Sequence, residues 1–234
     1  MKGLIKFLIG LVLLPICIGL ARSFILVIAL FSKLSELSFL FLSGFAAYFI
    51  FELIFSKPIR TYVLGHELSH IVASLLCGGL PKKLKISKRG GSVSLTKTNF
   101  FISLAPYILP LYTCVVLGVY FIVKHYFNFY YIHYVFFAIL GFSLAFHLRL
   151  TFFAVKQGQP DIEKTGVFFS LVFIVCVNLI VLVLLLKLLF PQSVNLARYF
   201  EDALFASVNV YIWIIGIMQL IISLVINKLR TVWG

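Results

Sequence analysis

Acidic side chains are scarce in this chain. Only 7 of its 234 residues are Asp or Glu, against 20 Lys or Arg, and charged residues together make up 12%. A water-soluble domain of this length needs far more charge on its surface, whereas 62% of these residues are hydrophobic. The composition therefore excludes an ordinary soluble protein and predicts a surface that faces lipid.

Cysteines are few as well. The four, Cys17, Cys77, Cys114 and Cys176, fall within or at the edge of apolar runs and have no paired spacing. This pattern indicates neither a disulfide framework nor a zinc site built on cysteines. We interpret them as small apolar packing residues.

The net charge of +13 would suggest nucleic-acid binding in a soluble protein. No known nucleic-acid-binding motif is present, however, and the 26 Phe residues lie in apolar runs rather than among basic residues. We therefore expect no nucleic-acid partner. Basic loops held at the anionic cytoplasmic leaflet of a membrane account for the excess.

Long apolar runs occupy most of the chain. They are Leu4–Phe31, Leu37–Phe55, Tyr62–Cys77, Phe100–Val123, Tyr130–Val155, Gly166–Phe190 and Ala203–Ile226. Several approach the roughly 20 residues that cross a bilayer as a helix, and none alternates like the strands of a membrane barrel. The runs predict an all-α multi-pass protein of the cell membrane, with six or seven transmembrane helices and no internal repeat.

The organisation along the chain follows from these runs. We expect N-terminal membrane segments over residues 1–60, a membrane core over 61–190, and a C-terminal segment with the last helix over 191–234. The first run holds Pro15 and Arg22, so it is one kinked helix, a span plus an interfacial piece, or partly a signal peptide. Whether residues 1–55 cross once or twice stays open.

One polar stretch, Gly78–Asn99, is long and basic, with six Lys or Arg and no acidic residue. Its centre, Leu84–Leu95, alternates apolar and polar residues on both sides of Gly90-Gly91. That alternation predicts a β-hairpin with a primed turn. The basic excess predicts that the hairpin is cytoplasmic.

The chemistry lies in His66-Glu67-Leu68-Ser69-His70, within the third apolar run. At 3.6 residues per turn, His66 and His70 project from one helix face, one turn apart, so both imidazoles can bind one ion. Glu67 lies about 100° round the helix, placed to act as a base on water without binding the metal. Three ionisable groups in five residues of an apolar helix are costly, and a zinc ion, one per chain, accounts for them.

A third metal ligand must come from elsewhere. Asp161 follows the helix-breaking Gly158-Gln159-Pro160 and precedes an apolar run. Its carboxylate can turn inward to a buried metal. Alternatively, it is only a capping or loop carboxylate, stabilised by the N-terminus of a helix. His147 is the rival third ligand, and it is otherwise a candidate for a group that supports the ligands from the second shell.

These features together resemble the site-2 protease family of intramembrane zinc metalloproteases. The resemblance covers Tyr62 to about Phe190. It rests on the His-Glu-x-x-His motif in a membrane helix, the basic Gly-Gly hairpin after it, Ala105-Pro106 in the next run, and an Asp before a later one. It implies that His66, His70 and Asp161 bind zinc and that Glu67 is the catalytic base.

The distal motif departs from the family. Members commonly have Leu-Asp-Gly after an Asn-Pro-type segment, whereas this chain reads Gln157-Gly158-Gln159-Pro160-Asp161. Gln157 or Gln159 is then the candidate to replace the Asn that orients the substrate.

The leading hypothesis is a zinc metalloendopeptidase that cleaves membrane-embedded proteins, such as single-pass helices or signal-peptide remnants, near the cytoplasmic face. The hairpin edge, with Ile86 and Val93, would hold an extended substrate by strand addition. Two alternatives remain: hydrolysis of a lipid-linked substrate, and a metal-binding membrane protein that is no enzyme. Outside the motif, we expect Glu52 to pair with Lys57 or Arg60.

Overall fold

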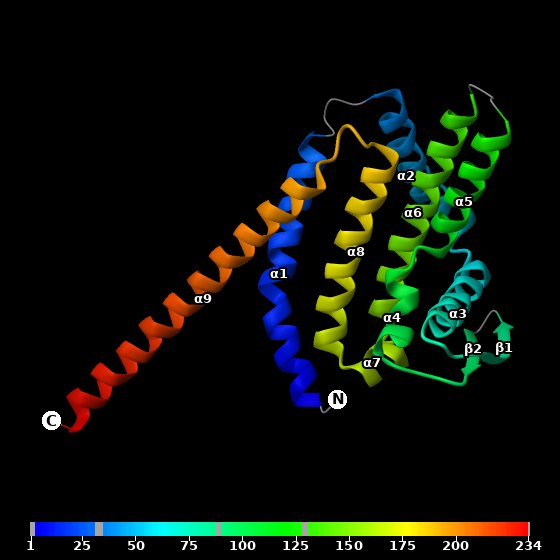
Figure 1. Ribbon diagram of the computed structural model, residues 1–234. Coiled ribbons are helices and arrows are strands. Elements are labelled where there is room, and N and C mark those ends of the chain that lie inside the picture. The colour runs from blue at the N-terminus through cyan, green and yellow to red at the C-terminus, as the bar shows by residue number, and fades with distance from the viewer. Residues whose placement is uncertain (1–2, 31–34, 88–89, 128–130, 234) are drawn as a thin grey trace. The chain divides into compact units, whose positions relative to one another are not determined.

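A computed structural model describes residues 3–30, 35–87, 90–127 and 131–233 of the chain. The residues form two compact units, one of residues 33–170 and the other of residues 1–32 with 171–234. The first unit holds α2 (Glu36–Phe55), α3 (Ile59–Leu76), β1 (Pro81–Ser87), β2 (Gly90–Leu95), α4 (Phe100–Ile108), α5 (Leu111–Tyr126), α6 (Ile132–Lys156) and α7 (Pro160–Thr165). The other holds α1 (Gly3–Leu30), most of α8 (Val167–Leu189) and α9 (Leu196–Trp233) (Figure 1).

The described residues contain five helices that are long and apolar enough to cross a membrane: α1, α2, α6, α8 and α9. A sixth is possible if α4 and α5, bent by 66° at a short break, form one span. The predicted multi-pass, all-α class is therefore supported. The first apolar run is one continuous helix with Pro15 inside it.

α3, which carries the His-Glu-x-x-His motif, is not among the candidate spans. Arg60 and the three ionisable motif residues lower the hydropathy of this 18-residue helix. Our expectation that the third apolar run is itself a full span is thus not supported. Seven spans would require α3, and without it the count is five or six.

α2 and α6 pack closely against each other in the first unit (Figure 1). Their backbones meet at two glycines. A Cβ on Gly44 would overlap the carbonyl of Ala138, and one on Gly141 would overlap the carbonyl of Phe41. Small residues that allow such close approach are typical of helix pairs in membranes. Beside them Tyr48, fully buried, contacts the edges of neighbouring aromatic rings.

The run from Phe100 to Val123, predicted as one helix, breaks in two. Leu109 ends α4 in an extended conformation, with φ −99° and ψ 106°, and Pro110 follows it. A residue before proline is disfavoured in the helical region, so the break follows from local sterics. The break turns α4 toward α3, against which it packs.

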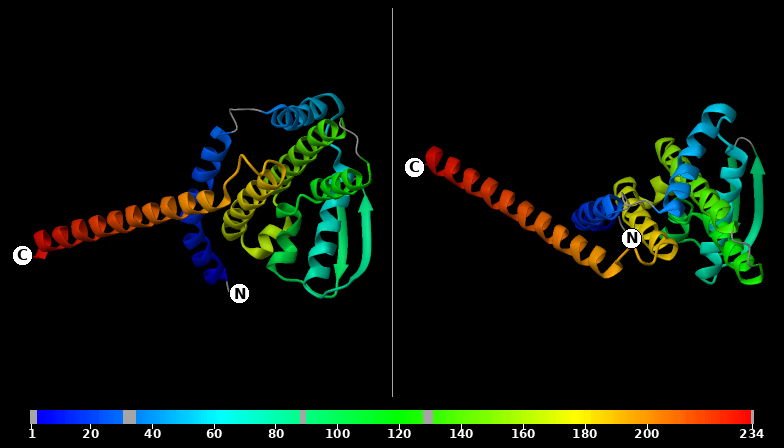
Figure 2. Two further views of the ribbon diagram at one scale, coloured as in Figure 1. Left: turned by 45° about the horizontal axis from the view of Figure 1, so that its top comes forward. Right: turned by 90° about the horizontal axis from the view of Figure 1, so that it is seen from above.

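The predicted hairpin is present as the antiparallel pair β1–β2, which packs alongside α3 (Figure 2). Its register pairs Leu84 with Val93 and Ser87 with Gly90. Gly90 and Gly91 therefore belong to β2 and are not the turn, contrary to our prediction. Residues 88–89, between the two strands, lie outside the described residues, so the prediction of a primed turn stays untested.

In the second unit, α1 and α9 pack together where Gly19 lies against Ala203 and Ser207. The hydroxyl of Tyr199 donates to the carbonyl of Leu20 at 3.3 Å. Beyond this crossing the apolar side chains of α9 are exposed, as expected for a helix surrounded by lipid.

Candidate metal centre

Three predicted ligands, distant in sequence, meet in the first unit. The Nε2 atoms of His66 and His70 lie 3.5 Å and 3.3 Å from the same Asp161 oxygen, Oδ2. In the part of the chain that the structure describes, these residues form the one group of three potential metal-ligating side chains, with their donor atoms within 4.8 Å of one another. His66 and His70 are nearly buried, and the Asp161 side chain is 28% exposed.

The spacing of these donors fits a tetrahedral zinc ion. Bonds of about 2.0–2.1 Å from zinc to nitrogen and oxygen place neighbouring ligand atoms about 3.3–3.4 Å apart. The observed distances of 3.5 Å and 3.3 Å match that edge. They are long for charge-assisted hydrogen bonds, which are about 2.7–2.9 Å, so a shared cation fits these residues better than two direct ion pairs do.

The other nitrogen of each imidazole has a partner that orients the ring. His70 Nδ1 lies 2.8 Å from the carbonyl oxygen of Ile102. Since a carbonyl only accepts, Nδ1 must carry the proton, which leaves the Nε2 lone pair of the neutral ring facing Asp161. His66 Nδ1 lies 3.2 Å from the hydroxyl of Tyr62. Such outer partners fix the tautomer of metal-binding histidines.

Pro106 makes the Ile102 carbonyl available to His70. In a helix the carbonyl of residue 102 would accept from the N–H of residue 106, but proline has no N–H. Asn99 caps the start of α4 by accepting from the Ile102 N–H at 2.8 Å, which holds this turn in place. From the sequence, Pro106 was noted only as one of the features that resemble the site-2 protease family. A proline four residues after a helical carbonyl is the signal that would have identified this partner.

Asp161 reaches the histidines because the chain reverses after α6. Gly158 has a φ of +68°, a conformation that favours glycine, and Pro160 then begins α7 with Asp161 in its first turn. Burial alone would raise the pKa of Asp161, but the two imidazoles beside its carboxylate hold this pKa well below its usual range. The carboxylate is therefore ionised at neutral pH, as a metal ligand must be.

Glu67, the expected base, lies on α3 against β2. It is only 6% exposed, and its carboxylate accepts a hydrogen bond from the backbone N–H of Val93 and is electrostatically coupled to both histidines and to Asp161. A Cβ on Gly91 would lie 2.8 Å from Glu67 Oε1. The backbone of β2 can approach the carboxylate this closely because residue 91 is glycine. We had noted this glycine only as part of a turn.

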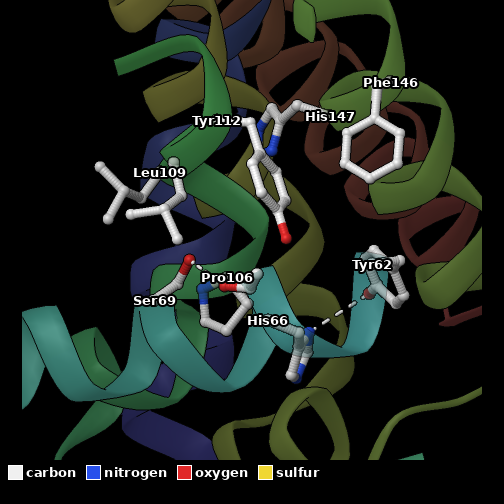
Figure 3. Close-up of a pocket in the computed structure, with 10 residues that line it drawn as sticks. Tyr62, His66, Ser69, Pro106, Leu109, Tyr112, Phe146 and His147 are labelled. Carbon is white, nitrogen blue, oxygen red and sulfur yellow. Dashed lines mark hydrogen bonds between the residues drawn. The ribbon is translucent and has the colours of Figure 1, made fainter. Parts of the chain in front are cut away.

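His147 does not join the three ligands. It lies on α6 and lines a small cavity of about 20 Å³ with Tyr62, His66 and Tyr112, enough room for about one water molecule. Figure 3 shows this cavity. Tyr62 and His66, which are hydrogen-bonded to each other, come from α3, whereas Tyr112 comes from α5 and His147 from α6. Among the described residues, Asp161 rather than His147 is therefore grouped with His66 and His70, and His147 lies beside the cavity.

The predicted substrate-binding residues are spread more widely. Gln157 ends α6 and is exposed, lining a cavity with Lys57 and Arg149. Gln159 precedes α7 and caps it without a side-chain hydrogen bond. On the hairpin, Ile86 is 40% exposed and pairs with Gly91, whereas Val93 is half-buried beside Glu67. Of these four, Val93 contacts the predicted catalytic group.

Comparisons of the chain with models of known protein families, with curated proteins and with solved structures find no match.

Proposed function

We propose that this protein is a membrane zinc metalloendopeptidase, with His66, His70 and Asp161 as metal ligands and Glu67 as general base. The observation that carries the proposal is the convergence of two imidazole nitrogens and one carboxylate oxygen at the edge distances of a zinc tetrahedron. The histidines lie on α3 and Asp161 lies on α7, which are far apart in the sequence. Their proximity therefore does not follow from the geometry of one helix.

Zinc held by His66, His70 and Asp161 would polarise a carbonyl group and activate a water molecule for attack. Glu67 then accepts the proton of the attacking water and returns it to the leaving amine. Its burial beside β2 keeps the carboxylate at a fixed place next to the ligands. Tyr62 and the Ile102 carbonyl hold the two imidazoles in position during the reaction.

The proposed substrate is a membrane-embedded polypeptide that is locally extended. All seven residues of β1 are exposed, so the hairpin offers a strand edge to which such a segment can add. α2 and α6, both candidate spans, belong to the same unit as the site. This arrangement supports cleavage at the membrane rather than of soluble peptides.

A co-expression assay tests the proposal. A tagged single-pass helix, with Gly and Ser residues at its centre so that it unwinds easily, is expressed with the intact chain or with Glu67→Gln. We expect cleavage by the wild type only, while both proteins retain zinc after purification. Glu163→Gln is the matched control, because this exposed carboxylate lies two residues from Asp161 and is not part of the group of potential metal ligands found in the described residues. Equal cleavage by Glu67→Gln and the wild type would refute the hydrolytic mechanism.

A further inference from the structure

A second cluster of charges lies between α2 and α6, apart from the metal ligands. Glu52 Oε1 lies 3.0 Å from Arg149 Nη2 and 3.4 Å from Lys57 Nζ. The Glu52 side chain is 12% exposed, whereas those of Lys57 and Arg149 are about one-third exposed. The ammonium of Lys57 also lies 4.9 Å from the ring centre of Phe153. Glu52 thus holds both cations in fixed positions while their outer sides remain accessible.

These cations line an open cavity of about 590 Å³. That volume falls in the range of about 300–1,000 Å³ found for ligand-binding clefts. Its lining residues are Lys57, Arg149, Phe152, Phe153, Lys156 and Gln157. The lining thus combines three cations with two aromatic rings.

The charges of this cavity are not balanced by the protein. Lys57, Arg149 and Lys156 supply three positive charges, and Glu52 supplies one negative charge, which leaves two in excess. Lys156 is exposed, and within the described residues no carboxylate forms an ion pair with it. A cluster of Arg and Lys with two uncompensated charges suits a phosphate group, whose oxygens accept charge-assisted hydrogen bonds.

The surroundings favour a phosphate that belongs to a lipid. Phe152, beside the cations, is 65% exposed. Arg149 and Phe152 lie in the last two turns of α6, and Glu52 lies in the last turn of α2; both helices are candidate membrane spans. The cavity is therefore at the ends of two membrane helices, where lipid headgroups lie. The exposed aromatic surface next to the cations would contact the acyl chains of a lipid. A soluble phosphate has no apolar part that could make this contact.

We infer that this cavity, which we call the α2–α6 basic cavity, binds the headgroup of an anionic phospholipid. Lys156, Lys57 and Arg149 hold the phosphate, and Phe152 contacts the first carbons of the acyl chains. The inference does not rest on the proposed peptidase activity, because none of these side chains belongs to the metal centre.

Native mass spectrometry of the full-length protein in a nonionic detergent tests the inference. The probes are dioctanoyl phosphatidylglycerol, dioctanoyl phosphatidylcholine, glycerophosphoglycerol without acyl chains, and inorganic phosphate. We expect one phosphatidylglycerol per chain, bound at least tenfold more tightly than phosphatidylcholine. Removal of one cation near a membrane surface costs about fivefold in affinity for an anionic lipid. Lys156→Gln should therefore bind phosphatidylglycerol about fivefold more weakly, and Lys57→Gln with Lys156→Gln about 25-fold.

Lys124→Gln, at the end of α5 outside the cavity, is the charge-matched control and should bind phosphatidylglycerol like the wild type. The inference is overturned if the two lipids bind equally, or if Lys124→Gln weakens binding as much as Lys156→Gln does. It is also overturned if glycerophosphoglycerol or inorganic phosphate binds as tightly as the lipid, since the occupant would then be a soluble phosphate. Lys156 is exposed and forms no ion pair with a carboxylate of the described residues, so its replacement leaves the Glu52–Arg149 pair intact.

Discussion

The hydroxyl of Tyr62 is the most informative atom to remove from the metal centre. It contacts His66 Nδ1 at 3.2 Å and touches neither Asp161 nor His70 through a hydrogen bond shown by the structure. Tyr62→Phe deletes this single contact and keeps the ring, which packs 5.6 Å from the His66 ring centre. The substitution therefore tests whether His66 is a metal ligand whose ring is oriented by the hydroxyl of Tyr62.

The size of the effect follows from the geometry. Loss of an outer hydrogen bond to a metal-binding histidine weakens metal affinity by about 10–100-fold, or about 1.4–2.8 kcal/mol. At 3.2 Å the Tyr62 contact is at the long end for a hydrogen bond, whereas His70 and Ile102 are 2.8 Å apart. We therefore expect the lower end of the range, about tenfold weaker zinc binding.

Competition with a zinc chelator, followed on the purified full-length protein, measures this affinity. Tyr112→Phe is the matched control. Its hydroxyl lines the same small cavity but donates to the carbonyl of Thr61 at 2.7 Å, not to a histidine. Its loss should leave zinc affinity unchanged. Equal zinc affinities of Tyr62→Phe and Tyr112→Phe would show that His66 is not held as a ligand in this way.

Three other substitutions test the Asp161 ligand, the approach of β2 to Glu67 and the packing of α2 against α6. Asp161→Asn should lose bound zinc, as measured by inductively coupled plasma mass spectrometry, whereas Glu163→Gln should retain about one zinc per chain. If both variants retain zinc, Asp161 is not a ligand. Gly91→Ala should keep zinc but reduce cleavage at least tenfold, because the added Cβ would lie 2.8 Å from the carboxylate of Glu67, the proposed base; unchanged cleavage would mean that β2 can move away freely. Gly141→Ala should lower the yield of folded protein in size-exclusion chromatography, because its Cβ overlaps a carbonyl of α2. Gly118→Ala, whose Cβ meets nothing within 4 Å, should not lower it, and equal yields would contradict the close packing of α2 and α6.

Composition and local pattern predicted much of this fold. Apolar runs located the membrane helices, and the alternation around Gly90-Gly91 located the hairpin. The turn was misplaced because two adjacent glycines are a strong turn signal, whereas here Gly91 is required for the approach of β2 to Glu67. The break at Leu109-Pro110 was missed because the apolar run continues through it, although Pro110 is a local signal for it.

The site was only partly readable from the sequence. The spacing of His66 and His70 places two imidazoles on one helix face, and this much is local geometry. The proximity of Asp161 depends on long-range packing of α7 against α4 and of α4 against α3, which no pattern in the chain specifies. The contact of Tyr62 with His66 could have been predicted, because Tyr62 precedes His66 by one helical turn. The contact of Glu52 with Arg149 depends on the register of α2 against α6, so the sequence suggested only Lys57 and Arg60, which are close in the chain, as partners; of these two, Lys57 lies within 3.4 Å of Glu52.

The central claim is that two imidazoles and one carboxylate hold a single cation. X-ray absorption at the zinc edge of the purified, full-length wild-type protein tests it most directly. We predict about one zinc per chain, surrounded by nitrogen and oxygen at about 2.0–2.1 Å, with the signature of two imidazoles and no sulfur. Purified intact protein that binds no zinc, or zinc with a sulfur neighbour at about 2.3 Å, would contradict the account.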